Sequence, residues 1–151
     1  MHDVDVDQSG RTDKLAMDTV LAFSDRIQGT ILISKAVKRE CYDHLKARGV
    51  RKGRIGVRLF IAGLVLLLQD HIAALETVTI DQEYAGAAQG DIKSELVQRL
   101  RQFWPDFRSD QVVLRSIGKK SRAHRLALET YRGKRQPDRR VGVEEVLGAL
   151  S

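Results

Sequence analysis

The sequence has only one cysteine, Cys41, among 151 residues. A single thiol excludes an internal disulfide and a zinc site built from several thiolates, and a buried or unreactive thiol is expected. The four histidines show no HExxH or paired-ligand spacing, so the sequence does not predict a zinc centre. Two prolines and 12 glycines leave little room for a linker, which predicts one domain over residues 1–151.

The sequence also lacks a long apolar run. The longest, residues 59–68, has ten residues, whereas a membrane-spanning helix needs about 20. We therefore expect this run to be a buried helix in a protein without a membrane partner. The amino-terminal stretch MHDVDVD is acidic and lacks the basic start and apolar centre of a secretory signal. These features predict a cytoplasmic location.

Positive charge is abundant and unevenly placed. The formal net charge is +6, and ten basic residues lie between Arg115 and Arg140, against only Glu129 and Asp138. Such a segment can attract a polyanion, most commonly nucleic acid. A solvated basic face that binds nothing specific explains the charge equally well.

Hydrophobic periodicity predicts an alternation of strands and helices. Val4 and Val6 alternate with Asp5 and Asp7, which predicts a short strand with both acids on one face. Strands are predicted at 4–7, 19–24, 29–34, 77–81 and 112–117, and helices at 35–48, 55–74, 91–104, 122–131 and 143–150. Residues 35–75 form either two helices or one broken helix, and the basic stretch 132–140 is predicted to be a loop. Asp91 is expected to cap the helix at 91–104, with Phe103 on its inner face and Pro105 ending it.

The order of these elements predicts an α/β fold with a mixed sheet flanked by helices. The short connection between the second and third strands favours a hairpin, so the first three strands are expected to form an antiparallel meander. A strand that follows a crossover helix lies parallel to a neighbour in the same sheet. We therefore expect the fourth strand to lie parallel to the first.

Two aspartates end strands that are predicted to be neighbours. Asp7 ends the first strand and Asp81 the fourth, and neighbouring strands lie about 4.8 Å apart. Two carboxylates so close repel each other unless a cation or a proton neutralises them. Magnesium prefers oxygen ligands, and two such ions about 4 Å apart can activate a water and stabilise the leaving oxygen of a phosphodiester. Each acid taken alone is more typical of a turn or a cap.

The segment VDQSG at residues 6–10 resembles the Asp-Glu-Ser-Gly opening of small prokaryotic families in the ribonuclease H-like superfamily. The predicted element order is similar to that superfamily over nearly the whole chain. The resemblance implies a ribonuclease H-like fold whose metal-binding acids stand on the first strand, at the end of the fourth strand and on flanking helices. By motif, Asp7 and Asp81 carry over.

Other positions depart from the pattern of that superfamily. Gln8 replaces the usual glutamate, which removes one possible ligand. The resemblance implies a helical acid after the third strand, for which Glu40 is the first candidate and Asp70 the second. In the last predicted basic helix, Glu129 is the only acid. Glu83 lies two residues beyond Asp81 and shares its face if the strand continues.

The segment IGKKSRAH at residues 117–124 precedes and opens a predicted helix, which Ser121 is expected to cap. Unpaired amides and the helix dipole favour anions there, so Lys119, Lys120, Ser121 and Arg122 are predicted to bind the substrate backbone. His124 can orient a phosphate or shuttle a proton, although a lone histidine in a basic helix is more often a surface residue. The segment lacks the GxxxxGK[ST] spacing of a P-loop.

These observations favour a magnesium- or manganese-dependent nuclease, or a related phosphoryl-transfer enzyme, acting on DNA or RNA. Asp7 and Asp81 are the expected metal ligands together with Glu40, and Glu83 and His124 complete the expected catalytic set. Two alternatives remain open at this point. One is a non-catalytic nucleic-acid-binding module on the same fold, and the other is a protein-interaction component whose apolar helix helps to form an oligomer such as a homodimer.

Overall fold

The computed structural model describes residues 1–84 and 86–151. Within them the strands form one mixed sheet in the order β5-β4-β1-β2-β3-β6. The strands are β1 (His2–Ser9), β2 (Thr19–Ser24), β3 (Gln28–Ile33), β4 (Leu75–Asp81), β5 (Val112–Arg115) and β6 (Arg139–Arg140). The helices are α1 (Lys35–Ala47), α2 (Lys52–Leu68), α3 (Ala87–Leu100), α4 (Arg122–Tyr131) and α5 (Val143–Ala149).

The predicted α/β class and the mixed sheet are confirmed. β1, β2 and β3 pair antiparallel, and β4 lies parallel to β1. β5 extends the sheet in parallel beyond β4. Short connections hold the first three strands together, and the long segment through α1 and α2 returns the chain so that β4 enters beside β1.

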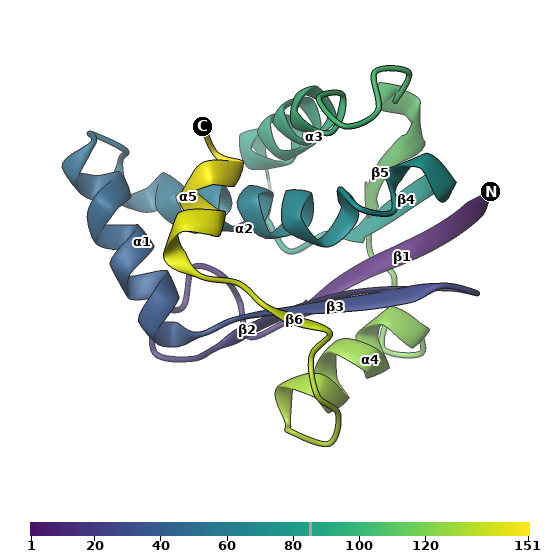
Figure 1. The fold of residues 1–151 in the computed structure, drawn as a ribbon, viewed down its shortest axis with the longest axis horizontal. Helices are drawn as coiled ribbons and strands as arrows, with labels where there is room; N and C mark the ends of the chain where they lie inside the picture. Colours follow the sequence, from purple (N-terminus) through teal and green to yellow (C-terminus); the bar gives the residue numbers. More distant parts are fainter. Residues whose placement is uncertain (85) are drawn as a thin grey trace.

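The sheet separates α4 from the other helices, as Figure 1 shows. α2 is apolar on nearly every side and is the centre of the larger core, as expected for a helix covered by neighbours all round. On the other face, α4 packs against β1 and β2 with a small apolar cluster. That cluster comprises Val20, Ala22, Leu32, Leu126 and Ala127.

β1 divides its side chains between the two faces. Val4 and Val6 are buried in the larger core, whereas Asp5 and Asp7 contact residues of α4 or its cap. This alternation follows from the two-residue period of a strand. The predicted placement of both acids on one face is therefore confirmed.

Several predicted boundaries were wrong. Residues 35–75 form two helices and a 3₁₀ turn, η1 (Ile72–Ala74), which is the first of the two alternatives, but the second helix runs over Lys52–Leu68 and not over 55–74. Asp91 does not cap α3, because the helix begins at Ala87, and Asp91 pairs instead with Arg54 at 2.5 Å. The 132–140 stretch is not wholly a loop, because β6 pairs parallel to β3.

The carboxyl end of α3 also differs from the prediction. The helix ends at Leu100, before Pro105, and Phe103 is 49% exposed instead of facing the core. A residue before proline avoids the helical conformation, and the chain has already turned ahead of Trp104. Among the described helices, none combines the length and apolarity needed to cross a membrane.

Candidate metal centre

Three carboxylates meet where β1 and β4 end. Asp7, Asp81 and Glu83 each offer one oxygen atom, and these oxygens all lie within 4.8 Å of one another. The register of the parallel pair sets Val6 beside Ile80, so Asp7 and Asp81 follow at the same level. Glu83 joins them from the segment just after β4. The structure thus brings together three of the acids singled out in the sequence.

Asp7 is held from two sides. Its Oδ1 accepts a hydrogen bond from the amide of Gln8 at 2.8 Å, and its Oδ2 lies 2.8 Å from Nδ1 of His124 on α4. When Nδ1 carries the proton it donates to Asp7, and Nε2 then remains as an acceptor. Asp7 is only 4% exposed, whereas the His124 side chain is 30% exposed. The histidine therefore connects a buried carboxylate with solvent.

Asp81 is fixed by the segment that links β5 to α4. Its Oδ1 accepts a hydrogen bond from the amide of Ile117 at 3.0 Å. Each carboxylate oxygen has more than one lone-pair direction, so Asp7 and Asp81 keep acceptor capacity beyond these bonds. Both side chains are oriented, and both can still accept a further ligand.

The electrostatics of the cluster disfavour three negative charges. Burial raises the pKa of Asp7. Burial also raises the pKa of Glu83 to about 7, and a hydrogen bond with Asp81 and the charges of Asp81 and Asp7 add to the rise. The positive charge of Arg11 opposes it. A proton or a cation relieves this repulsion.

The rim of the cluster contains Arg11 and Tyr84, two residues that the sequence did not single out. The Arg11 guanidinium carbon lies 4.9 Å from the centre of the Tyr84 ring, and Arg11 also pairs with Asp13 at 3.0 Å. The Tyr84 hydroxyl lies 2.5 Å from Oγ1 of Thr12. The only local signal for this rim was an arginine directly after Ser9 and Gly10. Thr12 and Tyr84 are 72 positions apart, so no local pattern marks their contact.

A buried lysine organises the loop that carries Arg11. Lys38 of α1 is fully buried, and its Nζ donates to the carbonyls of Arg11 at 3.1 Å and Lys14 at 2.5 Å and to Oγ1 of Thr19 at 3.0 Å. Burial lowers the pKa of this amine to about 8. Lys38 therefore ties α1 to the loop between β1 and β2.

Gly10 begins the same loop and is required by its geometry. Its φ is 76°, a conformation that favours glycine. A Cβ at this position would lie 2.0 Å from the carbonyl oxygen of Asp18. The glycine of the VDQSG segment thus allows the chain to turn sharply just after the acid cluster.

The structure does not bring Glu40 to Asp7 and Asp81. Glu40 is exposed on α1 and lines a hollow with His44 and residues of α5. Lys38 and Cys41 occupy the buried side of the helix instead. Asp70 is exposed, 3.9 Å from Arg139, and Glu129 lines a separate groove. None of these three acids joins the described cluster.

The predicted substrate-binding residues lie between β5 and the start of α4. Ser121 caps α4, since its hydroxyl accepts from the amide of Ala123 at 3.2 Å, and it also donates to Asp5 at 3.2 Å. The predicted cap is therefore confirmed, but the hydroxyl already has partners. Lys119, Lys120 and Arg122 are exposed, and no ion pair engages them among the residues described.

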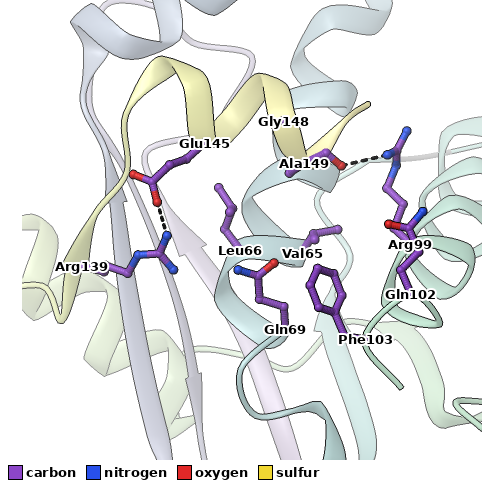
Figure 2. Close-up of a pocket in the computed structure, with 10 residues that line it drawn as sticks. All are labelled: Val65, Leu66, Gln69, Arg99, Gln102, Phe103, Arg139, Glu145, Gly148 and Ala149. Carbon is purple, nitrogen blue, oxygen red and sulfur yellow. Dashed lines mark hydrogen bonds and ion pairs between the residues drawn. The ribbon is translucent and has the colours of Figure 1, made fainter. Parts of the chain in front are cut away.

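A different pocket, shown in Figure 2, lies among α2, α3 and α5 and has a volume of about 260 Å³. Its two arginines already have partners. Arg99 donates to the carbonyls of Ala149, Leu150 and Ser151, and Arg139 pairs with Glu145. Because both arginines already have partners, the pocket lacks the free charged groups that make the acid cluster a candidate site.

Comparison of the chain with known protein families, with curated proteins and with solved structures finds no match. The chemistry open to the cluster therefore follows from its own geometry.

Proposed function

We propose that the chain is a divalent-cation-dependent nuclease, or a related phosphoryl-transfer enzyme, on a ribonuclease H-like fold. One observation carries the proposal. Asp7, Asp81 and Glu83 converge within 4.8 Å at the ends of β1 and β4, and His124 is hydrogen-bonded to Asp7. A histidine beside clustered carboxylates provides both cation ligands and a group that can move a proton.

The topology supports the ribonuclease H-like part of the proposal. An antiparallel β1-β2-β3 meander with β4 parallel to β1 and β5 beyond it is the arrangement that the resemblance of residues 6–10 implies. The convergence of acids from the first and fourth strands is the further feature that the resemblance implies.

The donor set suits magnesium or manganese. All three groups are carboxylates, which hard divalent cations prefer, and the buried position of Asp7 makes an uncompensated negative charge unfavourable. A bound cation of this kind polarises a phosphoryl oxygen and lowers the pKa of a water. The residues that would hold it are Asp7 and Asp81, with Glu83 as the third.

The remaining residues have roles that follow from their positions. His124 orients Asp7 through Nδ1, and its Nε2 can accept a proton at the cluster. Lys119 and Lys120 lie on the segment whose Ile117 amide binds Asp81, so their ammonium groups can hold the backbone of a nucleic acid near the acids.

A second candidate function is a nucleic-acid-binding module without catalysis. The observation that favours it is the incomplete acid set, because Glu40 does not reach the cluster. Such a module would bind nucleic acid in a strongly salt-dependent manner and show no turnover.

Calorimetric titration with Mn²⁺ and a cleavage assay on labelled RNA and DNA separate the two functions. We expect saturable binding and cation-dependent cleavage by the wild type. Asp7→Asn and Asp81→Asn should each lose cleavage by more than about 100-fold, since loss of even supporting groups around a metal costs about 10- to 100-fold. The matched control is Asp43→Asn, an exposed aspartate on α1, which should behave as the wild type.

Circular dichroism should show that both site variants keep the fold. Unchanged cleavage by both purified variants would exclude the proposed roles. Absence of saturable Mn²⁺ binding by the wild type would favour the non-catalytic module.

A further inference from the structure

The two flanks of α4 carry different groups. On one flank His124 reaches Asp7. On the other, Arg122, Arg125 and Glu129 line a groove against the β2–β3 hairpin, and Arg135 lines it from the segment after the helix. Positions 122, 125 and 129 share one side of a helix because each residue turns the chain by about 100°. The groove has a volume of about 230 Å³.

The arginines of this groove have no acidic partner among the residues described. Ion pairs engage Arg11, Arg54, Arg58, Arg99, Arg108 and Arg139 elsewhere. Within the described chain no side-chain hydrogen bond involves the guanidinium groups of Arg122, Arg125 or Arg135. Their planar donor sets match the oxygens of a phosphate.

The rest of the lining is mostly polar. Ser24, Asp25 and Gln28 contribute from the hairpin, and Leu126 is the one apolar side chain among the lining residues described. A protein partner usually needs an apolar or aromatic centre in its interface. A polar groove with free guanidinium groups suits a phosphodiester backbone better.

The groove lies close to the acid cluster. Ser24 pairs with Asp5 and Ala22 with Asp7, so the hairpin end of the groove is only two residues along the sheet, about 7 Å, from the level of Asp7. The width of α4, about 10 Å, separates the two flanks. A stacked nucleic-acid strand rises about 3.4 Å per phosphate, so about three phosphates span that width.

Building on the proposed function, we propose that this groove binds the phosphodiester backbone of a nucleic-acid strand about three nucleotides from the phosphate held at the acid cluster. The strand crosses the exposed side of α4, and its two ends are gripped on opposite flanks of the helix. The substrate is therefore an oligonucleotide or a longer nucleic acid and not a mononucleotide.

The test replaces Arg122, Arg125 and Arg135 with glutamine in one variant. Binding of a fluorescein-labelled 12-nucleotide strand, as RNA and as DNA, is measured by anisotropy in EDTA so that no cation contributes. We expect at least tenfold weaker binding than the wild type. The slope of log affinity against log salt should fall by about 2, because each single-strand phosphate contact contributes about 0.7.

A matched control removes the same charge from the opposite side of the molecule. Lys46, Arg48 and Arg51 are exposed at the end of α1 and in the turn that follows, and their triple replacement by glutamine should change affinity less than twofold. Glu129→Gln removes a negative charge from the groove and should tighten binding. A dinucleotide, too short to cross α4, should bind the wild type much more weakly than the 12-nucleotide strand.

Equal weakening by the groove and control variants would overturn the proposal, because charge alone would then explain binding. Competition by poly-glutamate as effective as that by the oligonucleotide would overturn it in favour of an acidic protein partner. The two proposals fail separately. Loss of strand binding in the groove variant without any cation-dependent cleavage by the wild type would keep the groove and reject the nuclease. Asp7-dependent cleavage by the wild type, together with unchanged strand binding in the groove variant, would keep the nuclease and reject the groove.

Discussion

The two faces of the sheet differ in what covers them. On one face, α2 and its neighbouring helices enclose a large apolar core. On the other, α4 packs over a small apolar cluster and brings His124 to Asp7. The comparison indicates that stability comes mainly from the α2 face, whereas the charged groups suited to chemistry gather on the α4 face.

β1 shows how one strand serves both purposes. Val6 is fully buried in the larger core, and the next residue, Asp7, is held by His124 of α4. Because consecutive side chains point to opposite faces, core packing of Val6 also fixes the direction of Asp7. Changes on one face should therefore be separable from changes on the other, and the following predictions test that separation.

The largest effect is expected from Leu64→Ala on the α2 face. Leu64 is fully buried in the apolar core, and such a truncation costs roughly 2–5 kcal/mol of unfolding free energy. Urea denaturation measures the loss, while Mn²⁺ affinity at low temperature should stay within about twofold. A large loss of cation binding in the still-folded variant would show that the two faces are not separable.

The next effect is expected from His124→Gln on the α4 face. Glutamine can still hydrogen-bond to Asp7 but cannot exchange a proton, so cleavage should fall by about 100-fold, the lower range for a general acid or base. Cation affinity by calorimetry and the thermal midpoint should change little. Full activity in this variant would assign His124 a purely positioning role toward Asp7.

A smaller effect, a gain in stability and not a loss, is expected from Glu83→Gln. Removing one of three crowded carboxylates relieves repulsion with Asp7 and Asp81, so the cation-free protein should gain about 1 kcal/mol after allowance for solvent screening. Thermal unfolding in EDTA measures the gain, and added Mn²⁺ should stabilise the variant less than the wild type. Glu76→Gln, an exposed position on β4, is the matched control.

A loss of stability in cation-free Glu83→Gln would contradict the picture of a repulsive cluster. It would mean that Glu83 is held by hydrogen bonds that outweigh the repulsion.

The smallest effect concerns Lys38. Burial lowers the pKa of its side-chain amine to about 8. Between that value and the ordinary pKa of about 10.4, the unfolded chain binds a proton that the folded chain does not. The unfolding free energy therefore rises with pH in this window, by roughly 1 kcal/mol from pH 8 to 9. Urea titrations of the wild type and Lys38→Met at both pH values measure the difference. A difference that does not grow with pH would contradict a lowered pKa.

The predictable part of the molecule is the part governed by local period and chain connectivity. The alternation around Val6 and the crossover before β4 were enough to expect Asp7 beside Asp81. Glu83 joins them as well, although β4 ends at Asp81 and the strand continuation on which its placement was predicted does not occur. The serine before α4 correctly marked the start of that helix.

The unpredictable part depends on tertiary packing. Lys38 is buried and Glu40 exposed because one side of α1 packs on the loop that carries Arg11. A charged residue at the buried position breaks the apolar pattern from which the buried side of a helix is predicted. The contact of Tyr84 with Thr12 joins two loops far apart in the chain, so no local signal marks it. β6 has only two residues, too few for a period to be recognised.

The hydrogen bonds of Ser121 to Asp5 and His124 to Asp7 fasten α4 to β1 at two successive positions on the face of the strand that α4 covers. α4 thus contributes His124 beside the acid cluster on one flank and arginines to the groove on the other. Any ligand that repositions this helix from one side alters what its other side presents. If the cluster binds a cation and the groove binds a polyanion, thermodynamic reciprocity then requires that each changes the affinity of the other by the same factor.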